Sequence, residues 1–111
     1  MPAPSRSGIV RLADARRALP PPGAGHSARV FRGETLDVWL AGTPAVSPTQ
    51  LSSHERDEVY VVLRGSGVLF HDGQRDAFQA GDLMYVAAGI EHRFEDFSED
   101  LEVWVVFYGE E

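Results

Sequence analysis

Residues 58–79 read EVYVVLRGSGVLFHDGQRDAFQ, a succession of strand-like runs separated by tight turns. Val, Leu and aromatic residues, which favour β-strands, are concentrated in the runs at 58–63 and 67–71, and a further run at 74–79 contains Phe78. The dipeptide Asp72-Gly73 is typical of a type I′ hairpin turn. This segment therefore predicts consecutive antiparallel strands.

The same pattern continues on both sides of this segment. Short apolar runs alternate with turns that contain Gly, Pro or Asp, and they predict further strands at 29–31, 35–41, 48–54, 83–87, 92–96 and 101–108. One or two helical turns are expected at 13–19, before the breaker at 20–23. Many short strands without helical spacers predict an all-β fold, a sandwich or barrel of antiparallel sheets with little helix.

The length of 111 residues predicts a single domain with one core. We divide it into a partly ordered N-terminal extension, 1–27, and a β-barrel domain, 28–111. The N-terminus lacks the pattern of a signal peptide, and no apolar run approaches the roughly 20 residues of a membrane span. We therefore expect a cytoplasmic location and no membrane partner.

The composition excludes several kinds of chemistry. Because the chain has no cysteine, thiol nucleophiles are excluded, and any metal must be bound through nitrogen and oxygen. The cationic residues are all Arg, which excludes lysine Schiff bases and lysine-anchored pyridoxal phosphate. A net charge of −7 would repel a phosphate backbone, so we expect no nucleic-acid partner.

His54, Glu58 and His92 are the strongest candidates for a functional site. Two imidazoles and one carboxylate are the minimum set that holds a divalent metal while leaving positions open. Because side chains alternate along a strand, Glu58 shares a face with Tyr60, and His92 shares a face with Phe94. If these faces turn inward, a metal ion would satisfy the polar groups in an otherwise apolar barrel.

Two motifs of the chain resemble those of the cupins. The first motif runs Gly, five residues, His-x-His, three or four residues, Glu, six residues, Gly, and its matches here are His54, Glu58 and Gly65. The second runs Gly, five residues, Pro-x-Gly, two residues, His, three residues, Asn, and it is matched by Gly81, Gly89 and His92, with Ala87 for Pro and Asp96 for Asn. The resemblance extends over 48–108.

The resemblance implies a double-stranded β-helix, or small jelly roll, with a metal pocket at the mouth of the barrel. It also implies a homodimer, which is common among single-domain cupins of this size. The family's usual ligands are three His and one Glu, but Ser52 occupies the place of the first His, which leaves His54, Glu58 and His92. Further candidates for ligands near these three are Gln50, Ser52 and Asp96.

The serine leaves three interpretations of the site open. The remaining residues could form the 2-His-1-carboxylate site of an Fe(II) oxygenase, or a zinc site with an open fourth position. Alternatively, the site has lost its metal. The cofactor expected from the sequence is one divalent transition metal, Fe, Mn, Zn or Ni, or none at all.

The leading functional hypothesis is a metal-dependent oxygenase or isomerase that acts on a polar small molecule, such as an enol, a catechol or a 2-oxo acid. Glu58 would be the catalytic residue, as a metal ligand or, without metal, as a general base. Three aromatic residues are candidates to line the pocket or fill the core: Tyr60, Phe94 and Trp104. The alternatives are a non-catalytic metabolite- or sugar-binding cupin with a degenerate metal site, and a structural dimerisation domain. The sequence does not decide between enzyme and binding protein.

Overall fold

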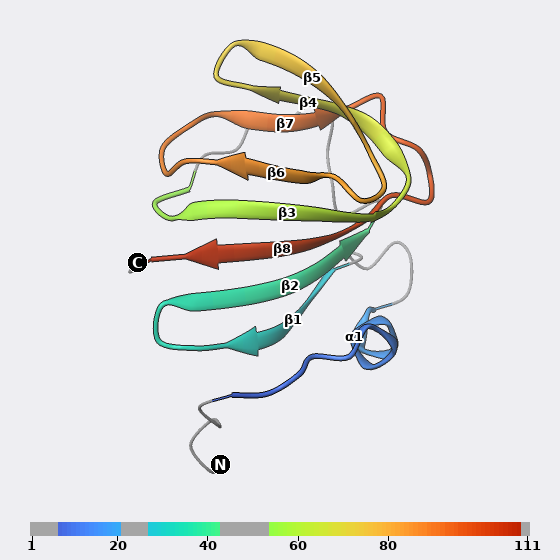
Figure 1. Cartoon of the computed structure of the whole chain (residues 1–111), viewed down its shortest axis with the longest axis vertical. Helices are drawn as coiled ribbons and strands as arrows, with labels where there is room; N and C mark the ends of the chain where they lie inside the picture. The colour runs from blue at the N-terminus through green and yellow to red at the C-terminus, as the bar shows by residue number, and fades with distance from the viewer. Residues whose placement is uncertain (1–6, 21–26, 43–53, 110–111) are drawn as a thin grey trace.

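The computed structural model describes residues 7–20, 27–42 and 54–109. One short helix precedes a series of strands (Figure 1). In chain order the elements are α1 (Leu12–Ala18), β1 (Ser27–Arg32), β2 (Leu36–Gly42), β3 (Asp57–Arg64), β4 (Ser66–His71), β5 (Gln74–Gln79), β6 (Leu83–Val86), β7 (His92–Glu95) and β8 (Glu102–Tyr108). The prediction of a mostly β fold is confirmed.

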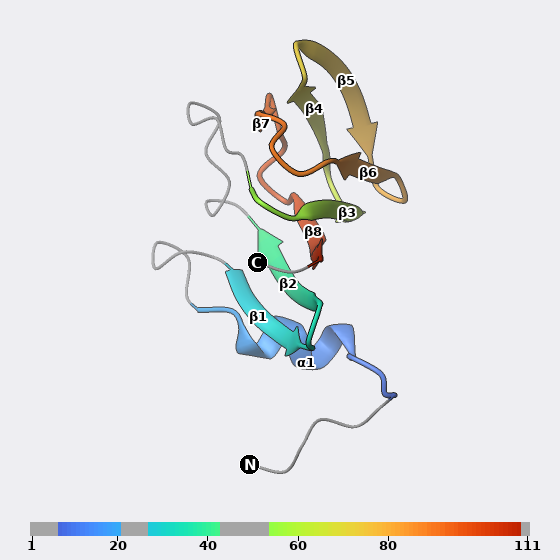
Figure 2. The same ribbon diagram turned by 90° about the vertical axis from the view of Figure 1, so that its left-hand side faces the viewer.

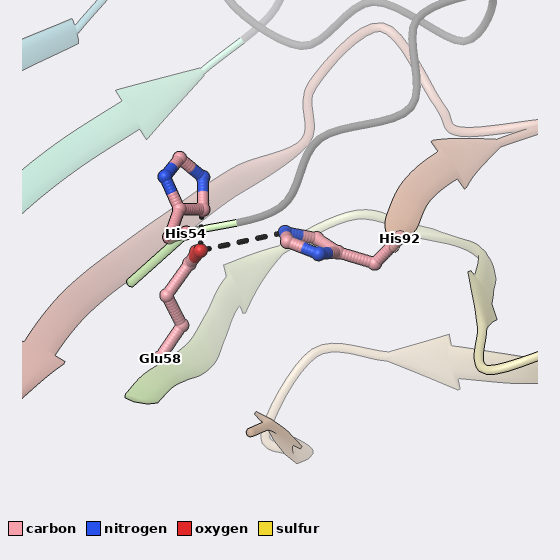
Figure 3. A group of neighbouring side chains, drawn as sticks. All are labelled: His54, Glu58 and His92. Carbon is pink, nitrogen blue, oxygen red and sulfur yellow. Dashed lines mark ion pairs between the residues drawn. The ribbon is translucent and has the colours of Figure 1, made fainter. Parts of the chain in front are cut away.

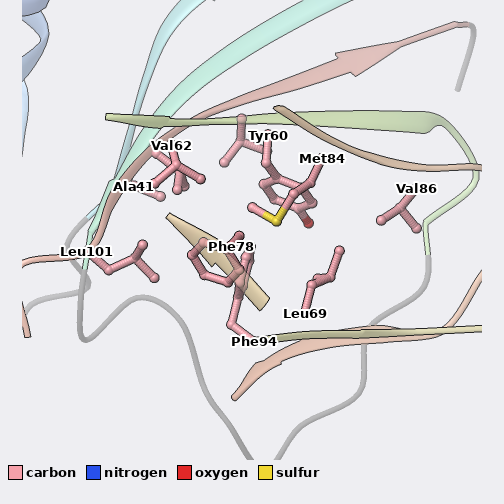
Figure 4. Packing of buried hydrophobic residues seen from close by; sticks show 11 residues of the cluster. Ala41, Tyr60, Val62, Leu69, Phe78, Met84, Val86, Phe94 and Leu101 are labelled. Atoms are coloured by element: carbon pink, nitrogen blue, oxygen red, sulfur yellow. The ribbon is translucent and has the colours of Figure 1, made fainter. Parts of the chain in front are cut away.

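Within the described residues the strands form two antiparallel sheets, ordered β1-β2-β8-β3-β6 and β5-β4-β7. The core lies between the sheets, where Tyr60 and Met84 of the larger sheet meet Leu69 and Phe94 of the smaller one (Figure 4). Burial alternates along β3, as expected for a strand with one face toward a core. That alternation fixes which side chains of β3 point into the barrel.

The predicted hairpin is confirmed. β4 and β5 pair from Ser66↔Gln79 to His71↔Gln74, and the turn between them has φ of 48° at Asp72 and 76° at Gly73, as a type I′ turn requires. The strands are close to their predicted positions, except that residues 48–53 of the strand expected at 48–54 lie outside the described residues. His54 itself precedes β3 and belongs to no strand.

The helix expected at 13–19 is confirmed as α1, which lies against β1 (Figure 2). Ala15 is buried, and Arg16 reaches Glu102 of β8, with a distance of 2.7 Å between Nη2 and Oε1. Burial raises the pKa of Glu102, but the ion pairs with Arg16 and Arg64 outweigh it, so the pKa is lower than usual. Among the described residues, no helix is long and apolar enough to cross a membrane.

The two glycines that begin or end the cupin-like motifs, Gly65 and Gly81, carry different constraints. Both have positive φ, 88° at Gly65 and 94° at Gly81. A Cβ at Gly65 would lie 2.5 Å from Ser98 Oγ and 2.8 Å from Leu101 Cα, whereas a Cβ at Gly81 would meet nothing within 4 Å. Gly65 is therefore required for both its conformation and its lack of a side chain.

We predict that Gly65→Ala lowers the free energy of unfolding by about 2–4 kcal/mol, because backbone strain and a steric clash add together. The matched control Gly81→Ala carries the strain alone and should cost about 1–2 kcal/mol. Urea denaturation of the parent and both variants measures the difference. Equal losses in the two variants would show that the close approach at Gly65 has no energetic consequence.

Candidate metal centre

The three predicted ligands come together at one end of the barrel, although they arise from separate parts of the chain (Figure 3). Glu58 lies on the inward face of β3, His92 is the first residue of β7, and His54 lies just before β3. One ligand atom from each residue lies within 4.8 Å of the others. Side chains from both sheets therefore contribute nitrogen and oxygen atoms to a single cluster.

Hydrogen bonds hold the two motif segments against each other. The backbone N–H of Gly89 donates to the carbonyl of His54 at 2.7 Å, and the N–H of Ala88 donates to Asp57 Oδ1 at 2.9 Å. Asp57 is the first residue of β3 and His54 lies three residues before it, and both donors lie in the turn that leads to His92. The relative position of His54 and His92 is therefore fixed by backbone contacts as well as by the core.

Glu58 is buried, at 2% exposure, and its two carboxylate oxygens have different surroundings. The Tyr60 hydroxyl donates a short hydrogen bond to Oε2. Oε1 lies 3.0 Å from His54 Nε2 and 3.5 Å from His92 Nε2, but it accepts no hydrogen bond with proper geometry from any described residue. A buried carboxylate oxygen without a donor is costly, and a cation between the three atoms would satisfy it.

His92 presents its Nε2 to the same point. Its Nδ1 lies 2.9 Å from the carbonyl of Ile90, a contact that requires a proton on Nδ1. In the neutral ring Nε2 then carries a lone pair, which is the form that binds metal. Tyr60 lies 3.0 Å from this nitrogen, but its single proton is directed to Glu58.

Electrostatics favour a bound cation at this point, whether a proton or a metal. Burial lowers the pKa of His92, but its contact with the negatively charged Glu58 and its hydrogen bond to the carbonyl of Ile90 raise the pKa by more, so the net pKa is higher than usual. Burial and the charge of Glu58 also raise the pKa of Tyr60, which therefore stays protonated as a donor. A divalent metal would compete with the proton of His92 for the same lone pair.

The site opens to an adjoining cleft on the side of His54, whose side chain is 41% exposed. The cleft has a volume of about 470 Å³ and is lined by Arg29, Asp37, Trp39, His54, Glu55, Arg56 and Phe107. Phe107 packs its ring edge-to-face against His54, with centroids 5.2 Å apart. A small molecule in the cleft would therefore lie beside the exposed imidazole.

The aromatic candidates have separate roles. Tyr60 belongs to the site, whereas Phe94 is buried in the core with its ring edge-to-face against Tyr60, 5.0 Å between centroids. Trp104 does not line the cleft, because it shares a face of β8 with Glu102, which pairs with Arg16 of α1. The opposite face of β8 carries Phe107, which sequence reasoning missed although it alternates with Val103 and Val105.

Of the additional candidate ligands, Asp96 lies among the described residues, and it does not join the cluster. Gln50 and Ser52 lie outside the described residues. Asp96 is exposed in the bend after β7, with φ of 47°, because the strand ends at Glu95 instead of continuing as predicted. Among the described residues, the candidate metal ligands are therefore His54, Glu58 and His92.

The chain matches a family model and a sequence relative over more than half of its length. The family model Cupin_2, described as "Cupin domain", matches residues 44–107, more than half of the chain. An uncharacterized protein from Streptomyces coelicolor is 32% identical over 83 residues, which cover 75% of this chain and 79% of that protein.

Solved structures share the fold at low sequence identity. A cupin superfamily protein from Desulfitobacterium hafniense superposes with a TM-score of 0.70 at 15% identity, covering 96% of this chain and 94% of that one. A predicted oxalate decarboxylase from Thermotoga maritima superposes with a TM-score of 0.60 at 24% identity, covering 76% and 79% of the two chains. These similarities support the architecture and leave the activity open.

We predict that Tyr60→Phe weakens metal binding by about 10–100-fold, because the carboxylate of Glu58 loses the donor that orients it. The matched control is Tyr85→Phe, since Tyr85 is 58% exposed on β6 and contacts none of the three ligands. A competition titration of Zn(II) against a chromophoric chelator measures both. Unchanged affinity in Tyr60→Phe would mean that the hydroxyl does not position Glu58.

Proposed function

The chain belongs to the Cupin_2 family, and on that premise we propose that it is a metal-binding cupin that acts on a polar small molecule. The observation that carries the proposal is Glu58 Oε1, a buried acceptor that faces His54 Nε2 and His92 Nε2 and receives no hydrogen bond from the described residues. Two imidazole nitrogens and a carboxylate oxygen are the donors that Fe, Mn, Zn and Ni accept in proteins. Among the described residues, this donor set suits a divalent transition metal.

The residues of the site divide the work of binding and orientation. His54, Glu58 and His92 would hold the metal, and a bound metal supplies Lewis-acid chemistry that polarises a substrate oxygen. The carbonyl of Ile90 fixes the tautomer of His92, and the hydroxyl of Tyr60 fixes the carboxylate of Glu58. The cleft beside His54 admits the substrate, and Phe107 forms part of its wall.

Oxygenase and isomerase activities are the two reactions that we propose for this site. A ligand set of two His and one carboxylate leaves positions open for a substrate with two oxygen donors, and for O2 in an oxygenase. Glu58 is the catalytic residue in either case, because it holds the metal or, in the metal-free chain, offers as a proton acceptor Oε1, to which no described residue donates a hydrogen bond. A metabolite-binding protein without turnover would use the same cleft.

We predict near-equimolar divalent metal in the parent protein purified without a nickel column, and its loss in His92→Ala and in Glu58→Gln. The matched control is His71→Ala, because His71 lies opposite His92 on the neighbouring strand but pairs with Asp76 instead of the cluster. Elemental analysis gives the stoichiometry. Metal content that is unchanged in both site variants would refute the assignment of the ligands.

Turnover separates the enzyme from the binding protein. We predict that the parent loaded with Fe(II) or Mn(II) consumes O2 with a catechol, or exchanges substrate hydrogen with solvent deuterium when given a 2-oxo acid. An oxygen electrode and NMR in D2O measure the two reactions, with His92→Ala as the inactive control. Saturable binding of these compounds without either reaction would favour the non-catalytic alternative.

We further propose that the protein forms a homodimer through β6, the strand at the end of the five-stranded sheet. Leu83 and Tyr85 on this strand are 64% and 58% exposed, and an edge strand with apolar side chains is a surface that a second copy can cover. Light scattering should give the mass of two chains, and Leu83→Asp should give one. A monomeric parent would contradict this assembly.

A further inference from the structure

Arg29 lines the cleft beside His54. It lies on β1 directly opposite Trp39 of β2, and its guanidinium carbon is 5.2 Å from the centroid of the indole ring. Both residues line the cleft that also contains His54. The guanidinium of Arg29 and the imidazole of His54, one of the three candidate ligands, therefore border the same space.

Arg29 carries a positive charge that no carboxylate of the described residues neutralises by an ion pair. The other arginine in the cleft, Arg56, differs in this respect. Its Nη1 lies 2.9 Å from Asp37 Oδ2, and its guanidinium also stacks on Phe107, 5.1 Å from the ring centroid. The cleft thus has one arginine already paired and one available to an anion.

Contact with an aromatic ring positions an arginine to bind an anion. The indole face holds the guanidinium plane in one orientation, and the N–H groups at the edge of that plane remain free to donate. A carboxylate accepts two parallel hydrogen bonds from such an edge. One unpaired guanidinium matches a single carboxylate better than a phosphate dianion, which would need a second cation.

The sheet register relates Arg29 to the metal centre. Arg29 pairs with Trp39, Trp39 with Val105, and Val105 with Tyr60, which is two residues from Glu58 on the same face of β3. Three strand spacings of about 4.8 Å separate β1 from β3, roughly 14 Å between backbones. The guanidinium of Arg29 lies over Trp39 of β2, one strand nearer to β3, so the span to the metal centre is shorter than this distance between backbones. A ligand of about six carbon atoms suits this span and fits within the cleft of about 470 Å³.

We propose that Arg29, held on Trp39, is the residue that recognises substrate carboxylate, and that the substrate is a small organic acid. One end of this acid presents oxygen atoms to the metal held by His54, Glu58 and His92, and its carboxylate at the other end pairs with Arg29. This inference rests on the proposed function, because the metal centre defines the first end. It adds the substrate class and the residue that selects it.

The test compares two acids of equal length on the Zn(II)-loaded protein by calorimetry. 2-Oxoadipate carries a second carboxylate for Arg29, whereas 2-oxohexanoate lacks it. The parent should bind 2-oxoadipate at least about tenfold more tightly, as expected for a charge-assisted hydrogen-bonded pair. Arg29→Gln should remove this preference without changing the Zn(II) stoichiometry or the binding of 2-oxohexanoate, and Arg29→Lys should restore only part of it.

Arg17→Gln is the matched control, because Arg17 is an exposed arginine of α1 that pairs with Asp14 outside the cleft. It should bind both acids like the parent. A loaded parent that binds the two acids equally, or that binds no 2-oxoadipate at millimolar concentrations, overturns the role of Arg29. A parent that takes up no Zn(II) refutes the metal centre instead, so the two failures are distinguishable.

Discussion

The mouth of this barrel is organised around the burial of one carboxylate. Glu58 is 2% exposed, and among the described residues only Tyr60 donates a hydrogen bond to it, at one of its two oxygens. Burying an ionised carboxylate without compensation costs several kcal/mol, so the surroundings must supply positive charge or protons. The imidazoles of His54 and His92 lie next to Oε1 and supply this positive charge, either as protonated rings or through a metal ion bound between them.

The fold and the candidate site depend on the same contacts. The hydrogen bonds from Gly89 to His54 and from Ala88 to Asp57 close the barrel mouth, and they also set the distance between the two imidazoles. The core ring of Phe94 packs on Tyr60, whose hydroxyl orients Glu58. A change in the core beneath Tyr60 would therefore be transmitted to the ligands, since packed interiors shift as units.

The sequence predicted the described strands and the hairpin at Asp72-Gly73, because strand alternation and turn residues are local properties. The convergence of His54, Glu58 and His92 is not local, and its prediction rested on the resemblance to the cupin motifs. The sequence did not predict the role of Tyr60 as a donor, the aromatic wall at Phe107 or the stacked Arg29, since each depends on which strands become neighbours. Trp104 was the more conspicuous aromatic on β8. Trp104 lies on the same face of β8 as Glu102, which pairs with Arg16 of α1. Predicting this requires knowing where the helix packs.

The central claim is that two imidazoles and the carboxylate of Glu58 bind one metal ion. X-ray absorption spectroscopy at the zinc edge of the Zn(II)-loaded protein tests it most directly, because zinc binds more tightly than iron or manganese to such donors. The account predicts outer-shell scattering from two imidazole rings per zinc, together with oxygen ligands at about 2.0–2.2 Å. A shell of oxygen atoms alone, without imidazole scattering, would contradict it.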